Sequence, residues 1–178
     1  ARIGAAGYTD LAVFANEGEI PVGADSSRDE VAAVRTAAAN AGLSPSMLLG
    51  RTKLNEGLEL AVDNYRRLID NAAELGARWL LDLGTGNEAH YEIYYELMRQ
   101  VAPHAGEAGI GISMKPHGGI SLTSEHLLDA CAQVDHPAFA ICYDPGNIIY
   151  YTSGASRPEN DMDEVAPRVS TAIVKDCI

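Results

Sequence analysis

Short apolar runs alternate with long amphipathic stretches along this chain, and that alternation is the feature that most constrains its fold. The runs are centred near Ile3, Met47, Leu80, Ile112, Ile141 and Ile173. After the first interval they recur at steps of about 29–34 residues. This spacing is close to the roughly 31 residues per unit of an eight-unit βα barrel of about 250 residues. The first interval is longer because residues 14–25 (FANEGEIPVGAD) insert a turn-rich loop.

The apolar runs have the composition of strands that are covered on both faces. They read RWLLDLG (78–84), GIGISMK (109–115), FAICYD (139–144) and STAIVKD (170–176). Strands that alternate with helices predict right-handed crossovers and a parallel sheet. An open doubly wound sheet is the alternative, but no GxGxxG follows the first run, which removes its commonest support.

The number of units favours an incomplete barrel. About six strands and five helices can be identified, whereas a closed (β/α)8 TIM barrel has eight of each. We therefore expect one α/β domain over residues 1–178, a parallel barrel truncated at its C-terminus. A first residue other than methionine points to truncation at the N-terminus as well.

The intervening stretches carry helix signals. In residues 58–75, apolar side chains follow the three-to-four-residue spacing of one buried face, and Gly76 is placed to end that helix. Asn87 is a good N-cap for the next helix. Pro103 is expected to kink or split that second helix, because proline removes a backbone donor.

Charge and composition exclude several partners. The formal net charge is −12 and the pI is near 4.7, so the long-range field repels nucleic-acid phosphates and no nucleic-acid partner is expected. No apolar run approaches the roughly 20 residues of a membrane helix, so no membrane partner is expected either. Cys131, Cys142 and Cys177 lack a CxxC spacing, which favours reduced thiols and a cytoplasmic protein.

Polar or ionisable residues end the expected strands. In parallel barrels the active site lies at the carboxyl ends of the strands, so position alone predicts a site there. The residues are Tyr8-Thr9-Asp10, Gly50-Arg51, Asp82, Lys115-Pro116-His117, Tyr143-Asp144 and Lys175-Asp176. A carboxylate that only caps the following helix is an equally good interpretation of Asp10 or Asp82 taken singly.

The segment MKPHGGIS (114–121) is the richest of these strand ends. Lys115 and His117 lie two residues apart and project to the same side of an extended chain. The glycines at 118 and 119 let the backbone approach a ligand closely. A histidine that merely belongs to the turn is the alternative, but the Lys-x-His pair at a strand end favours a catalytic role.

The segment CYDPGN (142–147) delivers Asp144 onto a Pro-Gly turn. That placement suits a metal ligand or a general base, with Asn147 hydrogen-bonding a substrate hydroxyl. An aspartate that only stabilises the turn is the alternative. Lys175 and Asp176 close the next strand, where a salt bridge between neighbouring strand ends is the competing interpretation.

The segments KPHGGIS, YDPGN and IVKDC, in this order and at barrel spacing, resemble the xylose-isomerase-like TIM barrels. These are sugar-phosphate isomerases and epimerases, with the related apurinic endonucleases, and the resemblance covers residues 40–178 well. It implies a divalent metal (Mn, Mg or Zn) held by a Glu, an Asp, a His and a final Glu from four strands. Asp144 matches the Asp, but Lys115 stands at the first Glu and Ile173 at the His. The final Glu would belong to a strand beyond Ile178.

The resemblance implies a sugar or sugar-phosphate isomerase or epimerase that abstracts a proton next to a carbonyl. Such chemistry needs a base and an electrophile for the enediolate oxygen. We expect Asp144 or His117 as the base and Lys115 as the electrophile in place of the usual metal. The expected substrate contacts are Asp82, Asn147, Lys175, Asp176 and Arg51.

Two other functions fit this fold. A non-catalytic, degenerate sugar-binding barrel is favoured by the missing metal ligands and opposed by the concentration of polar strand ends. A metal-dependent apurinic endonuclease needs a multi-histidine, multi-carboxylate cluster, and both the missing ligands and the net charge of −12 oppose it. For the isomerase or epimerase, the expected partner is a small-molecule carbohydrate substrate. Unpaired edge strands also make a homo-oligomer possible.

Overall fold

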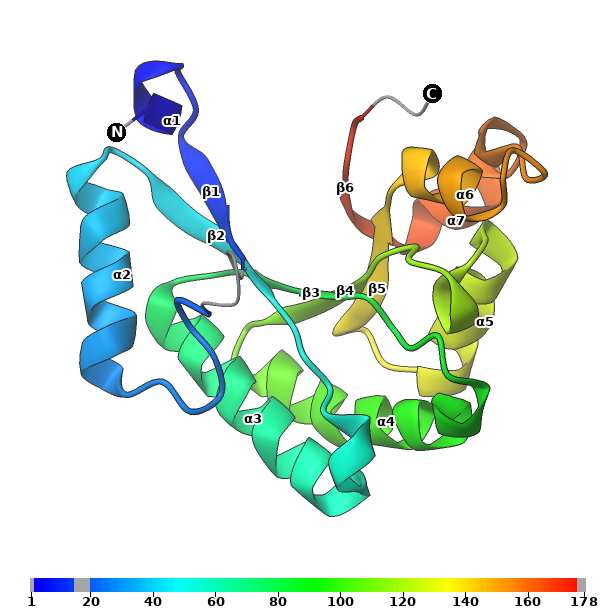
Figure 1. Ribbon diagram of the computed structural model, residues 1–178, viewed down its shortest axis with the longest axis horizontal. Helices are drawn as coiled ribbons and strands as arrows, with labels where there is room; N and C mark the ends of the chain where they lie inside the picture. Colours follow the sequence, from blue (N-terminus) through cyan, green and yellow to red (C-terminus); the bar gives the residue numbers. More distant parts are fainter. Residues whose placement is uncertain (1, 15–19, 176–178) are drawn as a thin grey trace.

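Six parallel strands curl into an incomplete barrel in the computed structural model of this protein, which describes residues 2–14 and 20–175. Within them the sheet order is β1-β2-β3-β4-β5-β6, with each strand beside its neighbour in sequence. Figure 1 shows the sheet curving from β1 to β6, which lie at its two edges. The strands are Asp10–Val13 (β1), Ser44–Leu49 (β2), Trp79–Asp82 (β3), Gly111–Met114 (β4), Phe139–Tyr143 (β5) and Val169–Ala172 (β6).

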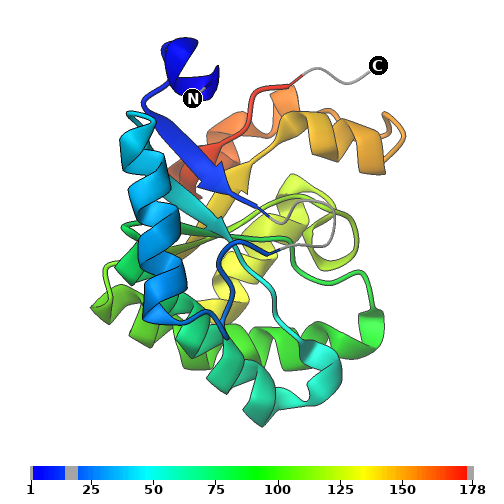
Figure 2. The ribbon, with the colours of Figure 1, turned by 60° about the vertical axis from the view of Figure 1, so that its left-hand side comes forward.

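The long helices cover the convex face of this sheet, as the two ribbon views show (Figures 1 and 2). They are Arg28–Asn40 (α2), Leu58–Leu75 (α3), Tyr91–Glu107 (α4) and Ser124–Val134 (α5), with the shorter helices Arg2–Ala5 (α1), Pro145–Tyr151 (α6) and Met162–Val165 (α7). An open doubly wound sheet would carry helices on both faces. The barrel prediction is therefore confirmed. No described helix has both the length and the apolar character needed to cross a membrane.

The predicted helix over residues 58–75 is confirmed at both ends. Gly76 adopts the left-handed conformation (φ 88°) that stops the helix. Its backbone N–H donates to the carbonyl oxygens of Ala72 and Ala73. Asn87, predicted to cap the next helix, caps the short 3-10 helix Glu88–His90, where its side chain accepts a hydrogen bond from Ala89 N (3.2 Å). The long helix α4 begins directly after it, at Tyr91. The predicted inner face of α3 is buried among the core, including Ala61, Val62, Tyr65, Leu68, Ile69, Ala72 and Leu75.

Pro103 does not split its helix. α4 runs from Tyr91 to Glu107 with the proline inside it. Met98, Val101, Ala102 and Ala105 are fully buried on both sides of Pro103. We attribute the continuity to this packing, which outweighs the lost backbone hydrogen bond.

The first predicted strand is wrong. Ile3 lies in the short helix α1, and the strand that joins the sheet is β1, whose Asp10 pairs with Ser44 of β2. Asp10 therefore begins a strand instead of ending one, and the segment Tyr8-Thr9-Asp10 lies at the end opposite the predicted site. A short apolar run does not by itself distinguish a helix from a strand. Here the hydrogen bonds between β1 and β2 determine which residues form the strand.

Gly111 allows β3 and β4 to pair beside a tryptophan. Trp79 is its partner in the parallel register, and a Cβ added at Gly111 would lie 2.1 Å from Trp79 Cζ3. We expect Gly111→Ala to lower the free energy of unfolding by about 1–3 kcal/mol, because the indole ring must move. Urea denaturation measures this, with Gly86→Ala as control, since a Cβ there has no described atom within 4 Å apart from its chain neighbours. Equal effects of the two substitutions would contradict the interpretation.

Candidate active site

Three charged side chains from neighbouring strand ends converge on one point. Lys115 directly follows β4, Asp144 directly follows β5, and Lys175 lies just beyond β6. Both lysine Nζ atoms lie 3.3 Å from Asp144 Oδ2. The Asp144 side chain is fully buried, whereas Lys115 and Lys175 are 14% and 39% exposed. We call these residues the lysine–aspartate cluster, and with both amines protonated it carries one net positive charge.

The start of helix α6 fixes the carboxylate of this cluster. Asp144 is the N-cap of α6, and its Oδ1 accepts a hydrogen bond from Asn147 N (2.9 Å). The Asn147 side chain donates to Pro116 O and accepts from Lys175 Nζ. Asn147 is only 5% exposed, so its amide links the segment after β4 to the lysine after β6.

His117 lies beside the cluster and contacts a tyrosine that the sequence did not single out for this role. Its Nε2 is 3.0 Å from the Tyr151 hydroxyl, and the two ring centroids are 5.0 Å apart. Its backbone N–H donates to Ser121 Oγ (3.0 Å). Loss of water around the ring, and then the nearby Lys115 ammonium, lower the pKa of His117 below its usual 6.5. The imidazole is therefore neutral at neutral pH and able to accept a proton.

Asp82 lies at the end of β3 but is enclosed by other protein groups. Its Oδ2 accepts from the Tyr65 hydroxyl (2.9 Å), and its Oδ1 accepts from the Tyr94 hydroxyl (2.8 Å) and Gly84 N (2.8 Å). Asp82 is 1% exposed, and burial raises its pKa. Its oxygens thus join α3 and α4 to the sheet. The sequence does not reveal these two tyrosines as partners of Asp82, because no local pattern marks a hydroxyl that reaches another element.

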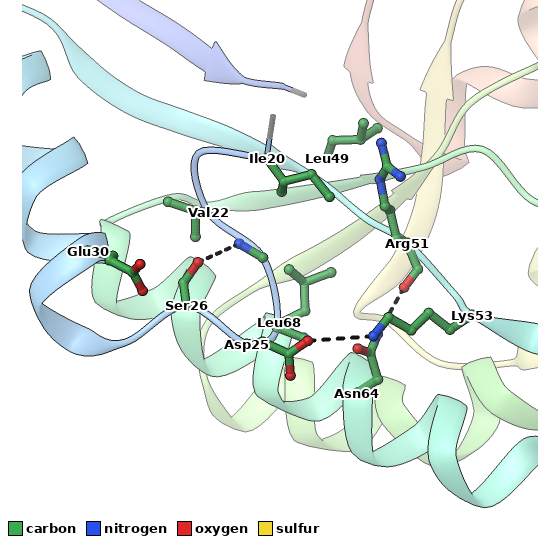
Figure 3. Close-up of a pocket in the computed structure, with 12 residues that line it drawn as sticks. Ile20, Val22, Asp25, Ser26, Glu30, Leu49, Arg51, Lys53, Asn64 and Leu68 are labelled. Atoms are coloured by element: carbon green, nitrogen blue, oxygen red, sulfur yellow. Dashed lines mark hydrogen bonds and ion pairs between the residues drawn. The ribbon is translucent and has the colours of Figure 1, made fainter. Parts of the chain in front are cut away.

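Arg51 follows β2 and lines a separate pocket of about 300 Å³ between segment 20–26 and α3 (Figure 3). None of the residues of the lysine–aspartate cluster lines this pocket. Within it, Asn64 Nδ2 donates to Arg51 O (3.2 Å). Asp176, the remaining predicted substrate contact, lies outside the described residues.

The donor set does not fit the divalent metal that the resemblance implies. Within residues 2–14 and 20–175, no three His, Cys, Asp or Glu side chains are grouped so as to hold a metal ion. Two ammonium groups lie 3.3 Å from Asp144, the one carboxylate that matches the family pattern. A cation there would face two positive charges, so we derive no step through a metal.

Comparison with solved structures supports the barrel. A xylose isomerase-like TIM barrel protein from Mycobacterium smegmatis, solved with magnesium, aligns over 98% of this chain with a TM-score of 0.80 and 20% identity. A xylose isomerase domain protein from Planctomyces limnophilus aligns over 96% with a TM-score of 0.75 and 18% identity. A sugar phosphate isomerase/epimerase from Parabacteroides distasonis aligns over 98%, covering 67% of that chain, with a TM-score of 0.69 and 17% identity.

The chain spans 66% of the Planctomyces protein and 64% of the Mycobacterium protein. No curated protein matches it in sequence. At these identities the structural likenesses show the fold alone. The model of one protein family, described as the xylose isomerase-like TIM barrel, matches residues 1–176. This chain, with its six parallel strands and outer helices, therefore belongs to the xylose isomerase-like TIM barrel family.

Proposed function

We propose that this protein is an isomerase or epimerase of a small sugar or sugar phosphate and that it moves a proton on a carbon next to a carbonyl. The structural basis of the proposal is the segment after β4, where burial and then the Lys115 ammonium lower the pKa of His117, and where that ammonium pairs with Asp144 (3.3 Å). A base and a cation that are close together are what enolisation requires. Structural neighbours named as a sugar phosphate isomerase/epimerase, a 3-keto-D-glucoside 4-epimerase and D-psicose 3-epimerase support the same reaction class.

In this proposal His117 is the base and Lys115 stabilises the enediolate oxygen. His117 removes the proton next to the carbonyl while the Lys115 ammonium neutralises the negative charge that develops on oxygen. For isomerisation, His117 returns the proton to the neighbouring carbon while the hydroxyl proton passes from one enediol oxygen to the other through solvent. For epimerisation, water protonates the same carbon on the face opposite His117, and His117 gives up its proton to solvent. Asp144 is the weaker candidate for the base, because its buried carboxylate already lies against two ammonium groups.

The other residues of the cluster position these two groups. Asp144 holds Lys115 in place, and Asn147 orients Lys175, whose partly exposed amine is available to a substrate oxygen. We assign Asp82 to packing, since both of its oxygens are occupied by protein donors.

Exchange of substrate protons with D₂O tests the proposed reaction. A panel of ketoses and sugar phosphates is incubated with the protein in D₂O, and deuterium on the carbon next to the carbonyl is followed by NMR. Incorporation above the protein-free rate is the expected result. Within residues 2–14 and 20–175, no three His, Cys, Asp or Glu side chains are grouped to hold a metal ion, which favours one rival, a sugar-binding barrel without catalysis. Saturable sugar binding without exchange would support that rival and contradict the proposal.

The pH dependence of the reaction tests His117 itself. A histidine with a lowered pKa stays neutral until the pH falls below its usual 6.5, so the acidic limb of kcat/KM should lie below that value. His117→Gln is expected to lower kcat/KM by about 10²–10⁴-fold and to remove this limb. His136→Gln, which lies ahead of β5 at the opposite end of the barrel, should keep the wild-type profile. An unchanged acidic limb in the His117 variant would overturn the assignment.

A further inference from the structure

The pocket beside Arg51 has the features of a ligand site and is separate from the proposed catalytic groups. Its volume of about 300 Å³ lies at the lower end of the range for small-molecule pockets. Val22, Leu49 and Leu68 supply an apolar wall, and Figure 3 shows Arg51 extending beside Leu49. Leu49, the last residue of β2, and Arg51 just beyond it line the pocket, which therefore lies at the carboxyl end of that strand.

A buried amide oxygen in this pocket has no hydrogen-bond partner among residues 2–14 and 20–175. Asn64 is 3% exposed, and its Nδ2 donates to Arg51 O (3.2 Å). This bond fixes the orientation of the amide, because a backbone carbonyl accepts only from the nitrogen. Oδ1 makes no hydrogen bond within the part of the chain that the structure describes. A buried acceptor without a donor costs free energy, which a ligand hydroxyl or N–H would recover.

Among the residues that the structure describes, the charges around the pocket leave Arg51 without an ion-pair partner. Asp25 is paired with Lys53 (3.6 Å) and Arg67 (3.3 Å). The Glu30 carboxylate accepts from Ser27 N and Ser27 Oγ (2.7 and 2.9 Å). Among residues 2–14 and 20–175, the Arg51 guanidinium has no such partner. A planar guanidinium matches the geometry of carboxylate and phosphate oxygens.

We propose that this pocket binds a small hydroxylated oxyanion, a carboxylate or a phosphate, through Arg51 and Asn64. The guanidinium of Arg51 holds the anionic group, Asn64 Oδ1 accepts from a hydroxyl, and the carbon skeleton lies against the apolar wall. This proposal does not depend on the proposed reaction, because the pocket and the lysine–aspartate cluster share no residue.

Calorimetric titration with three probes tests the site. D-gluconate carries a carboxylate, sn-glycerol 3-phosphate carries a phosphate, and D-glucitol is a neutral polyol. We expect saturable one-to-one binding of one or both anions and none of glucitol, and the tighter anion identifies the preferred group. Arg51→Gln should weaken this binding by about tenfold to a hundredfold, as expected for one hydrogen-bonded charged contact. The side-chain amide signals of Asn64 should shift on binding in the NMR spectrum.

The matched control is Arg78→Gln, which removes the same charge from an exposed arginine ahead of β3, at the opposite end of the strands. It should bind the anion as the wild type does. Failure of both anions to bind would overturn the proposal, as would equal affinities of the Arg51 variant and the wild type. Binding that survives Arg51→Gln and is lost in Lys115→Met would place the ligand at the lysine–aspartate cluster, which also overturns it.

Discussion

Replacing Lys115 with methionine is expected to lower kcat/KM for sugar isomerisation by about 10²–10³-fold, which is the usual cost of losing one group that stabilises a developing oxyanion. Methionine keeps the unbranched side chain but removes the ammonium. The effect should fall mainly on kcat, because the charge that Lys115 meets exists only in the transition state. Steady-state kinetics on a substrate found by D₂O exchange measures it. Unchanged turnover would rule out Lys115 as the electrophile.

A structural role for Lys115 must be separated from this catalytic one. Removing its ammonium leaves Lys175 as the remaining lysine paired with buried Asp144, and a poorly compensated buried charge destabilises a protein. The double variant Lys115→Met/Asp144→Asn removes both charges and should recover part of the denaturation midpoint lost in the single variant. Its activity should stay low. Recovery of activity together with stability would mean that Lys115 acts only through its ion pair.

Replacing Tyr94 with phenylalanine is expected to lower the free energy of unfolding by about 1.5–3 kcal/mol, the range for a hydrogen bond to a charged group. Its hydroxyl donates to Asp82 Oδ1 (2.8 Å) inside the core, where water cannot replace it. Tyr91→Phe in the same helix is the control, because its hydroxyl makes no hydrogen bond within the part of the chain that the structure describes. Urea denaturation compares the two, and equal losses would contradict the role given to Tyr94.

The destabilisation by Tyr94→Phe should also depend on pH. Burial raises the pKa of Asp82 above its usual 3.8, so the stability associated with its neutral form is fully present below that value and is lost as the pH rises through the raised pKa. The Tyr94 hydroxyl counteracts this rise, and its removal raises the pKa of Asp82 further. The loss of unfolding free energy in Tyr94→Phe, relative to the wild type, should therefore be larger at about pH 7 than at about pH 4. A difference independent of pH would indicate that Asp82 is not the partner that matters.

The same carboxylate shows where sequence reasoning reaches its limit. Asp82 could be placed at a strand end from the apolar run before it, but its partners could not be assigned. Tyr65 and Tyr94 come from α3 and α4, and only the packing of these helices on the sheet brings both hydroxyls to one carboxylate. Tyr151, which contacts His117, was missed as a partner for the same reason.

The sequence by itself determined the parallel barrel, the helix that ends at Gly76, and the positions of Lys115 and Asp144 after their strands. These features follow from periodicity and capping, which depend on near neighbours in the chain. Pairing with β2 decided that β1 starts only at Asp10 and that Ile3 lies in a helix. The short apolar run around Ile3 has too little local preference for either helix or strand to predict this.

Only the tertiary structure decided which strand ends act together. The order of the sheet places β4, β5 and β6 side by side, and this brings Lys115 and Lys175 to one oxygen of Asp144. Arg51 follows β2 and lines a different pocket, which Asn64 also lines. The physical reason is that ion pairs and buried hydrogen bonds depend on distances across the sheet, which strand order and register set and local sequence does not.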